Sequence, residues 1–459
     1  MNVHEKSANG AIALENEAPE GMKPAGVILQ TEEALHLGVL LHKDGHFDEA
    51  ERLYRKILDS SPDNLNALHF LGLICHQQDR HAEASELIGR IVDLRPQDPE
   101  AHNNFGNTLA ALGEFDRAEA CYRKAIGLNA YFASAYSNLG VMLMRRGELA
   151  EALEACRKAA ELAPDRVDSN FSLGQALRRS GRVDEAVGVF RNVLRLNPDH
   201  LMAWQELARI FGHEGRHKEA VEIFNEFAHA TRDNECVKYF EAAFLDRETP
   251  DRAPDSYVEM IFDHMATHFD SHLKDHLDYR APELLVDALE DFLPPPSRVL
   301  EILDAGCGTG LCGALLRPHA KNLTGVDLSS GMLAKASERN IYDNLVKSEL
   351  REFLGQSSEE YDVIVSADTL CYFGPLETVV VNAFKALKTG GLFAFTLELA
   401  QEEGRDFRLN PNSRYSHTGA YARGSLRAAG FAVKVSREVV LRTEGGEPVT
   451  GQLLVAGKE

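Results

Sequence analysis

Ile302-Leu303-Asp304-Ala305-Gly306-Cys307-Gly308-Thr309-Gly310 is an apolar run that ends in a carboxylate and three alternate glycines. Residues Val299 to Leu303 predict a strand, and Leu311 to Leu316 predict a helix directly after the glycines. Glycines allow the chain to reverse tightly because no Cβ stands in the way. A strand, a glycine turn and a helix in this order predict an α/β domain that holds a nucleotide-type cofactor against its backbone.

A second predicted strand, Asn322 to Val326, ends in Asp327, 21 residues after the first glycine of the turn. In a parallel sheet the carboxyl end of this strand lies beside the glycine turn. We therefore expect Asp327 to accept hydrogen bonds from both hydroxyls of a cofactor ribose. In a later buried run, residues 361–373, the polar residues Asp368 and Tyr372 appear only at the carboxyl end. This places them at the edge where ligands of open α/β sheets bind.

Two classes of cofactor fit the glycine turn. The run Gly308-Thr309-Gly310-Leu311-Cys312-Gly313 satisfies the dinucleotide pattern literally, which leaves a nicotinamide-dependent oxidoreductase open. Asp304 before the turn and the alternation of the glycines instead resemble the first motif of class I S-adenosylmethionine-dependent methyltransferases. The resemblance continues in the same order over residues 256–459. Segments 277–282 and 414–417 are similar to the UbiE/UbiG-like group of that family.

The methyltransferase resemblance implies a cofactor, S-adenosyl-L-methionine, and the residues that hold it. Asp304 and the backbone of the turn would meet the methionine end, Glu349 the adenine amino group, and Leu350 the face of the ring. A helical segment before the sheet would close over the cofactor and bring Phe269 and Tyr279 near it, unless these are only core aromatics. The implied cofactor-binding residues are Asp304, Gly306, Gly308, Gly310, Asp327, Leu328, Met332, Glu349, Leu350 and Tyr279.

Methyl transfer from a sulfonium is an in-line displacement, so positioning and the exclusion of water supply much of the acceleration. An acceptor that loses a proton also needs a group at the rim of the site to take it. His417 has a suitable ordinary pKa, and Asp368 and Tyr372 are rivals for this catalytic role. The structural alternatives are that Tyr372 only caps its strand and that His417 only braces a loop.

The first half of the chain repeats itself from Thr31 to Asn234, with a period of 34 residues and six units. An alanine follows twelve places after the small residue at the eighth place of each unit, and a large residue follows four places later. These residues predict two closely packed helices per unit. The eighth-place residues are Gly38, Gly72, Gly106, Gly140, Gly174 and Ala208. The pattern resembles the tetratricopeptide repeat family.

The repeat resemblance implies an α-solenoid whose concave groove binds a peptide or protein. Exposed positions of the first helices would line the groove, and a ladder of asparagine amides would clamp the peptide backbone. The alternative is a solvated helix face without a ligand. The asparagines concerned are Asn103, Asn104, Asn107, Asn138 and Asn170.

The composition of the chain limits the partners and the compartment that we expect for the protein. The chain has 459 residues and a formal net charge of −22, which disfavours nucleic acid as a partner. Seven scattered cysteines without a Cys-x-x-Cys pair fit a reducing, cytoplasmic compartment and suggest no zinc site. We expect no membrane span. Four histidines, from His264 to His276, recur at every fourth residue, but Asp270-Ser271 interrupts them and no further ligand type accompanies them, so we expect no metal there.

The sequence as a whole predicts a tetratricopeptide α-solenoid followed by a Rossmann-like, seven-stranded methyltransferase domain. We expect a flexible tail over 1–30, six repeats over 31–234, a capping helix and linker over 235–255, and the methyltransferase domain over 256–459. The predicted activity is S-adenosylmethionine-dependent methyl transfer to an unidentified acceptor, with the repeats recruiting a partner or the substrate. The alternative is a scaffold whose cofactor domain is catalytically silent.

Overall fold

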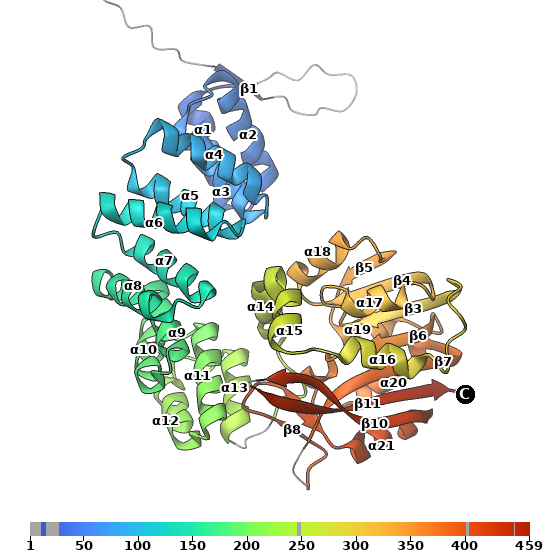
Figure 1. Cartoon of the computed structure of the whole chain (residues 1–459). Helices are drawn as coiled ribbons and strands as arrows, with labels where there is room; N and C mark the ends of the chain where they lie inside the picture. The colour runs from blue at the N-terminus through green and yellow to red at the C-terminus, as the bar shows by residue number, and fades with distance from the viewer. Residues whose placement is uncertain (1–10, 15–26, 246–248, 401–403, 445) are drawn as a thin grey trace, which may run out of the picture. The chain divides into compact units, whose positions relative to one another are not determined.

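The computed structural model describes residues 11–14, 27–245, 249–400, 404–444 and 446–459. Side chains 27–29, 268, 272 and 274–276, and those of residues 11–14, lie outside this description. The chain divides into two compact units, residues 1–197 and 198–459, each of which is considered by itself (Figure 1). The sixth repeat belongs to the second unit. The predicted division into a repeat region to 234 and a catalytic domain from 256 stays a prediction.

The first unit consists mainly of antiparallel helix pairs, as the repeat period predicts. Side chains cap several of the first helices: Asn64 accepts a hydrogen bond from Ala67 N, and Asp98 accepts from Glu100 N and Ala101 N. The helices are α1 Thr31–Lys43, α2 Phe47–Ser60, α3 Leu65–Gln77, α4 His81–Leu94, α5 Pro99–Ala111, α6 Phe115–Leu128, α7 Ala133–Arg146, α8 Leu149–Leu162, α9 Val167–Arg179 and α10 Val183–Leu196.

The eighth-place glycines bring the two helices of each repeat together. A Cβ on Gly174 would lie 2.5 Å from Cε1 of Phe190, and a Cβ on Gly106 would lie 2.6 Å from Cε1 of Tyr122. Phe190 is fully buried, so the ring of one helix fills the space above the glycine of the other. The predicted packing of the large residue across the neighbouring helix is confirmed in these repeats.

The segment before the repeats contains two short strands among its described residues. β1 Ala11–Leu14 pairs in antiparallel register with β2 Val27–Gln30. The prediction of a flexible tail over 1–30 did not include this pairing, because four-residue strands give little periodic signal. The other residues of the segment lie outside the described ranges.

The second unit begins with three helices, followed by the α/β part of the chain. Helix α13, residues 235–245, is the predicted capping helix. The helices are α11 Leu201–Glu214, α12 His217–Phe227, α13 Glu235–Leu245, α14 Asp255–Met265, η1 Ala266–His268, α15 Phe269–His276, α16 Ala281–Leu289, α17 Leu311–Leu316, α18 Ser330–Glu338, α19 Leu350–Gln356, η2 Leu370–Tyr372, α20 Glu377–Ala386 and α21 Gly419–Ala428.

A mostly parallel sheet forms the centre of the second unit. Its strands are β3 Leu300–Ala305, β4 Ala320–Asp327, β5 Asn344–Lys347, β6 Tyr361–Ser366, β7 Leu387–Leu399, β8 Phe407–Leu409, β9 Tyr415–His417, β10 Phe431–Glu444 and β11 Glu447–Lys458. Seven of them follow the order β10-β11-β7-β6-β3-β4-β5. Strands β7, β6, β3, β4 and β5 run parallel to one another, and the β10–β11 hairpin closes the sheet, with β11 antiparallel to β7.

Both faces of the sheet are covered by helices (Figure 1). Successive strand residues point to opposite faces, so Ile302 packs in the core with α16 and α17, while Leu303 packs in the core with α19, α20 and α21. The continuous apolar run of β3 reflects this burial on both sides. The predicted Rossmann-like architecture is confirmed.

Two further strands lie beside the main path of the sheet. β9 pairs in parallel with the end of β7 at Glu398 and Leu399, and β8 pairs with β9. No strand was predicted at 414–417, because three-residue strands leave no periodic pattern by which to find them. The end of β7 therefore has an additional neighbour at the carboxyl edge of the sheet.

The glycine packing predicts opposite effects of two substitutions in one repeat. Gly174→Ala should lower the free energy of unfolding by about 1–3 kcal/mol, because the new methyl group meets Phe190 in a filled core. Gly188→Ala should raise it by about 0.5–1 kcal/mol, because Gly188 is exposed in α10 with no atom within 4 Å of its Cβ position. Urea unfolding of the full chain measures both values. A Gly174→Ala protein as stable as the parent would contradict the packing argument.

Candidate active site

Of the three glycines in the turn after β3, Gly308 is open, whereas Thr369 packs against Gly306 and Tyr342 against Gly310. Gly306 N and Cys307 N donate to Val326 O at 2.8 and 3.0 Å, which fixes the turn against β4. Gly308 adopts a φ of 52°, and the ring of Phe269 is the nearest group to its Cβ position, at 3.9 Å. A ligand can thus approach the backbone at Gly308 closely, as the sequence predicted.

Asp327 is oriented by the same turn. Its Oδ2 accepts from Gly308 N at 2.9 Å and its Oδ1 accepts from Ser329 N at 2.9 Å. Burial raises the pKa of Asp327, and the hydrogen bonds from the backbone act in the opposite direction. A carboxylate has about four lone-pair sites, so the two bonds leave capacity for ribose hydroxyls. Of its predicted neighbours, Leu328 is half-buried and Met332 is fully buried.

Asp304 is a buried carboxylate whose negative charge is only partly stabilised by hydrogen-bond donors. Its side chain is 1% exposed, and its Oδ2 accepts from the Tyr342 hydroxyl at 2.7 Å. In the described part of the chain, Oδ1 has no hydrogen-bond partner of good geometry. Burial raises the pKa of Asp304 to about 6, while the Tyr342 hydroxyl and the Gly313 amide lower it. An unpaired buried carboxylate oxygen suits a cationic donor such as an ammonium group.

Glu349 lies at the amino end of α19, where its Oε2 accepts from Glu352 N at 2.9 Å. Its Oε1 faces two guanidinium groups, with Arg252 Nε at 3.7 Å and Arg351 Nε at 3.6 Å. Leu350 follows as a buried residue of the core. The sequence suggested Glu349 as a partner for adenine but did not predict these arginines.

A helical segment that precedes the sheet contacts the glycine turn. Asp263 of α14 accepts from Ser329 Oγ at 2.5 Å and from Gly331 N at 2.9 Å. Asp270 of α15 accepts from Thr309 Oγ1 at 2.5 Å and pairs with Arg339. These carboxylates hold the segment over the turn. Sequence reasoning identified the cover but missed Asp263, whose role depends on a contact 68 residues away.

Three aromatic rings join the cover to the end of β6. Phe262 contacts Phe269 at 5.9 Å and Tyr372 at 5.7 Å between ring centroids, both edge-on. Burial, followed by the charge of Asp368, raises the pKa of Tyr279 well above its ordinary range. Asp368 is thus among the charged groups near Tyr279, whereas the aromatic rings beside the turn are Phe269 at Gly308 and Tyr342 at Gly310.

Asp368 lies just beyond β6 in a left-handed conformation, with a φ of 54°. Its N–H donates to Thr396 Oγ1 at 2.9 Å, and its Oδ2 accepts from Arg442 Nη1 at 2.5 Å. Its buried Oδ1 has no hydrogen-bond partner within the described ranges. Residues other than glycine adopt this conformation infrequently, although aspartate does so more readily than most, and such positions occur often at functional sites.

His417 is 0% exposed, so the expectation that it stands at the rim of the site is wrong. A nitrogen of its ring, Nε2, lies 2.8 Å from Gly374 O. Burial lowers the pKa of His417 to about 4, which keeps the imidazole neutral at pH 7. Sequence reasoning used the ordinary pKa of histidine and could not foresee its burial in β9. Its catalytic role stays untested.

One group of potential metal ligands is present near Asp368. Ligand atoms of Asp368, Cys371 and Glu398 lie within 4.8 Å of one another. Arg442 forms ion pairs with both carboxylates, so a guanidinium already supplies the positive charge there. Of the histidine run, the side chains of 268, 272 and 276 lie outside the described residues.

The first helices of the repeats line a groove of about 600 Å³. Asn138 donates to Asn103 Oδ1 at 3.0 Å across adjacent repeats. Asn170 is not among the residues that line the groove, and its amide donates to Pro164 O at 2.8 Å. The predicted ladder is therefore shorter by one residue. The asparagines that line the groove are Asn103, Asn104, Asn107 and Asn138.

Comparison with known proteins agrees with the two kinds of structure. A family model described as a methyltransferase domain matches residues 277–432. Models described as tetratricopeptide repeats match residues 41–105, 103–167 and 171–235. The chain is thus a tetratricopeptide-repeat protein that carries a methyltransferase domain. None of the helices in the described ranges is long and apolar enough to cross a membrane.

Several characterised methyltransferases are similar to the catalytic part. A malonyl-[acyl-carrier protein] O-methyltransferase of Enterobacter lignolyticus is 30% identical over 139 residues, which are 30% of this chain and 52% of the relative. Methyltransferase-like protein 27 of Homo sapiens is 36% identical over 138 residues, 30% of this chain and 56% of the relative. A ubiquinone biosynthesis O-methyltransferase of Rickettsia bellii is 34% identical over 97 residues, which are 20% of this chain and 40% of the relative. The chain spans about half the length of the first two relatives.

The burial of Asp304 predicts a pH-dependent stability. Between about pH 4 and pH 6 the folded protein keeps a proton on Asp304 that the unfolded chain has released, so the free energy of unfolding falls as the pH rises. Asp304→Asn removes this fall in the free energy of unfolding, because an asparagine side chain does not titrate. The stability of the variant relative to the parent should rise by about 3 kcal/mol from pH 4 to pH 7, the equivalent of two pKa units.

Urea unfolding at a series of pH values measures this difference. The matched control is Asp291→Asn, which changes an exposed aspartate in the same way. A difference between Asp304→Asn and the parent that is the same at pH 4 and pH 7 would show that Asp304 titrates normally in the folded protein.

Proposed function

We propose that the chain is an S-adenosylmethionine-dependent methyltransferase whose repeats recruit a protein partner or a protein-bound substrate. One observation carries the cofactor assignment. The unpaired Oδ1 of Asp304 and the oriented carboxylate of Asp327 flank an open glycine turn, with Phe269 beside it. This arrangement offers acceptors for a cationic group and for vicinal hydroxyls at opposite ends of one ligand.

Each of these residues has a distinct task in the proposal. Asp304 binds the methionine ammonium, Asp327 binds the ribose hydroxyls, and Glu349 with Leu350 contacts the adenine. S-adenosylmethionine supplies a methyl group activated by a sulfonium. Phe269, held by Asp270 and Phe262, limits the access of water to the turn. Exclusion of water and orientation of the reactants are the main contributions that a displacement of this kind needs.

Asp368 is the residue that we assign to the acceptor. Its free Oδ1 can orient the acceptor group or take its proton, and its position after β6 is at the carboxyl edge of the sheet. Tyr372 lines the same edge through its contact with Phe262. Burial and the low pKa of His417 support a structural role, in which the ring holds the Gly374 carbonyl.

The identity of the acceptor is open within this proposal. Two of the relatives are named as O-methyltransferases, which favours an oxygen acceptor. The repeat groove favours an acceptor that is part of a protein or is carried by one. The seven cysteines are all free, which supports a reducing compartment such as the cytoplasm.

Replacing Asp327 tests the cofactor assignment. The full chain should bind S-adenosylhomocysteine in a calorimeter and should not bind NAD. Asp327→Asn should weaken S-adenosylhomocysteine by about tenfold or more, because one strong acceptor of the ribose hydroxyls is lost. Asp291→Asn, at an exposed position, should bind like the parent.

Labelled methyl transfer into a lysate then separates an enzyme from a silent scaffold. The parent should transfer label and Asp327→Asn should not. Binding of S-adenosylhomocysteine without any transfer would favour the scaffold alternative, and binding of NAD instead would favour the oxidoreductase.

The groove assignment predicts loss of a partner. Replacing Asn104 and Asn138 together by alanine should weaken the partner that the repeats retain from a lysate by about tenfold, because amides that bind a peptide backbone are removed. Helical circular dichroism should stay unchanged. Gln97→Ala, an amide on an exposed loop, serves as the control. Equal retention by all three proteins would contradict the groove.

A further inference from the structure

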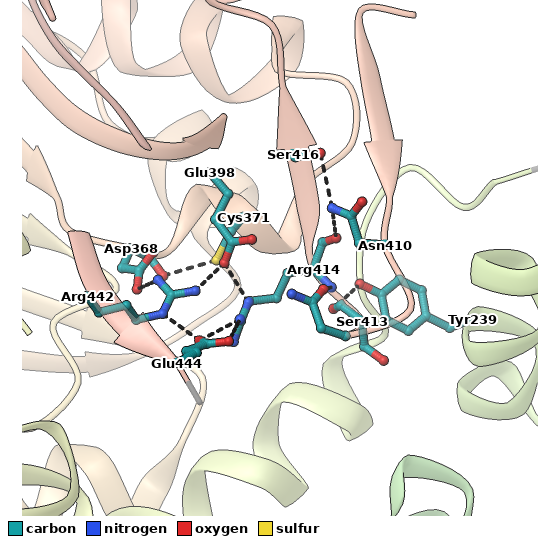
Figure 2. A network of polar contacts seen from close by, with 11 residues as sticks. Tyr239, Asp368, Cys371, Glu398, Asn410, Ser413, Arg414, Ser416, Arg442 and Glu444 are labelled. Carbon is teal, nitrogen blue, oxygen red and sulfur yellow. Dashed lines mark hydrogen bonds and ion pairs between the residues drawn. The ribbon is translucent and has the colours of Figure 1, made fainter. Parts of the chain in front are cut away.

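Helices α11 and α13 hold the loop between β8 and β9. Tyr239 of α13 donates from its hydroxyl to Ser413 O at 2.8 Å (Figure 2). Its ring lies 6.1 Å from that of Tyr415. Ser413 is 3% exposed and adopts a φ of 63°. Gly212 of α11 has no side chain at the point where Pro411 packs. The loop is therefore fixed from the helical side.

Arg414, the next residue of this loop, points in the opposite direction. Its Nε lies 2.6 Å from Glu398 Oε1 at the end of β7. Its Nη2 donates to both oxygens of Glu444, at 2.6 and 2.8 Å. Asn410 donates to the carbonyl of Arg414 at 3.1 Å. The guanidinium is thus held in one geometry between two carboxylates.

Arg442 continues the network to the end of β6 (Figure 2). It is 3% exposed, lies next to an irregularity in the β10–β11 register, and pairs with Glu398. Its Nε donates to Glu444 Oε1 at 2.6 Å, and its Nη1 donates to Asp368 Oδ2 at 2.5 Å. Both arginines therefore share Glu398 and Glu444. A buried charge that loses a partner is costly, so these groups move together or not at all.

Asp368 connects the network to the glycine turn. The left-handed conformation of Asp368 sets the direction of the next residue, Thr369. Thr369 Oγ1 lies 3.2 Å from Ala367 O and 3.4 Å from Gly306 O, and its side chain occupies the space that a Cβ on Gly306 would need. A shift of Asp368 must therefore move Thr369 against the turn or away from it.

We propose that Arg442, Arg414 and Tyr239 are positioning residues of the active site. Through them, helix α13 holds Asp368 and the glycine turn in the geometry that binds the cofactor. Every step from Tyr239 to Thr369 is a hydrogen bond, an ion pair or a covalent neighbour, and the Thr369 side chain packs against Gly306. The inference rests on the proposed cofactor site and adds that the helix following the last repeat acts on it.

Coupling of this kind is reciprocal, because a group that favours cofactor binding is itself stabilised by the cofactor. We expect saturating S-adenosylhomocysteine to slow hydrogen exchange of the backbone amides in 235–245 and 410–415 of the full chain by about twofold or more. A network that only stabilises the fold would leave exchange in α13 independent of the cofactor.

Tyr239→Phe removes one hydroxyl and leaves the ring in place. It should weaken S-adenosylhomocysteine by roughly two- to tenfold, the range of one net hydrogen bond, and should abolish the protection of 235–245. Tyr361→Phe is the matched control, since Tyr361 is a buried tyrosine at the opposite end of β6. The control should change neither affinity nor protection.

Arg442→Lys keeps the charge but loses the planar fork that reaches three carboxylates. We expect at least a tenfold loss of S-adenosylhomocysteine affinity in a protein that retains its circular dichroism. If Arg442→Lys does not fold, Tyr239→Phe decides the question.

Three results would overturn the inference. Normal binding heat with unchanged exchange in α13 would refute the coupling and leave the proposed function intact. Absence of binding heat in the parent would refute the proposed function, and the coupling with it. Equal effects of Tyr239→Phe and Tyr361→Phe on affinity would likewise refute a specific role of Tyr239.

Discussion

The burial of carboxylates at one edge of a parallel sheet is the constraint around which the second unit is organised. Asp304, Asp327 and Asp368 lie at or just beyond the ends of β3, β4 and β6, and each is compensated differently. Backbone N–H groups surround Asp327, a guanidinium pairs with Asp368, and Asp304 has the Tyr342 hydroxyl and the Gly313 amide. The ionised form of a buried carboxyl group becomes less favourable when fewer hydrogen-bond donors or positive charges stabilise it. Residues of the same chemical type can therefore have different properties.

Local patterns were sufficient to predict much of this edge. Alternate glycines after a buried strand, and a carboxylate at the end of the next strand, are short-range features whose geometry the backbone determines. Gly308 and Asp327 accordingly meet as predicted, with Gly308 N donating to Asp327. The repeats could be predicted equally well from the sequence, because the same helix contact recurs with a period of 34 residues.

Features that depend on distant partners could not be predicted from the sequence. Arg442 reaches Asp368 across 74 residues and beside an irregular register, and nothing in the sequence around either residue indicates the pair. His417 was assigned by its ordinary pKa, but three-residue strand pairing buries it. Asn170 shares the pattern of the groove asparagines, yet a proline carbonyl at the preceding turn takes its amide. Sequence patterns indicate which residue types recur and at what spacing, whereas tertiary contacts determine whether a given side chain is exposed.

The arginine network has an energetic implication of its own. A partly buried arrangement of two guanidiniums and three carboxylates seldom adds stability beyond what apolar side chains of the same volume would provide, because desolvation offsets the attraction. What such a network provides is a fixed geometry, since several charged groups must be satisfied at once. Asp368 needs this, because its left-handed backbone is unfavourable unless its surroundings determine it. The network is therefore better explained by the position that it enforces at the carboxyl edge of the sheet than by the stability that it adds.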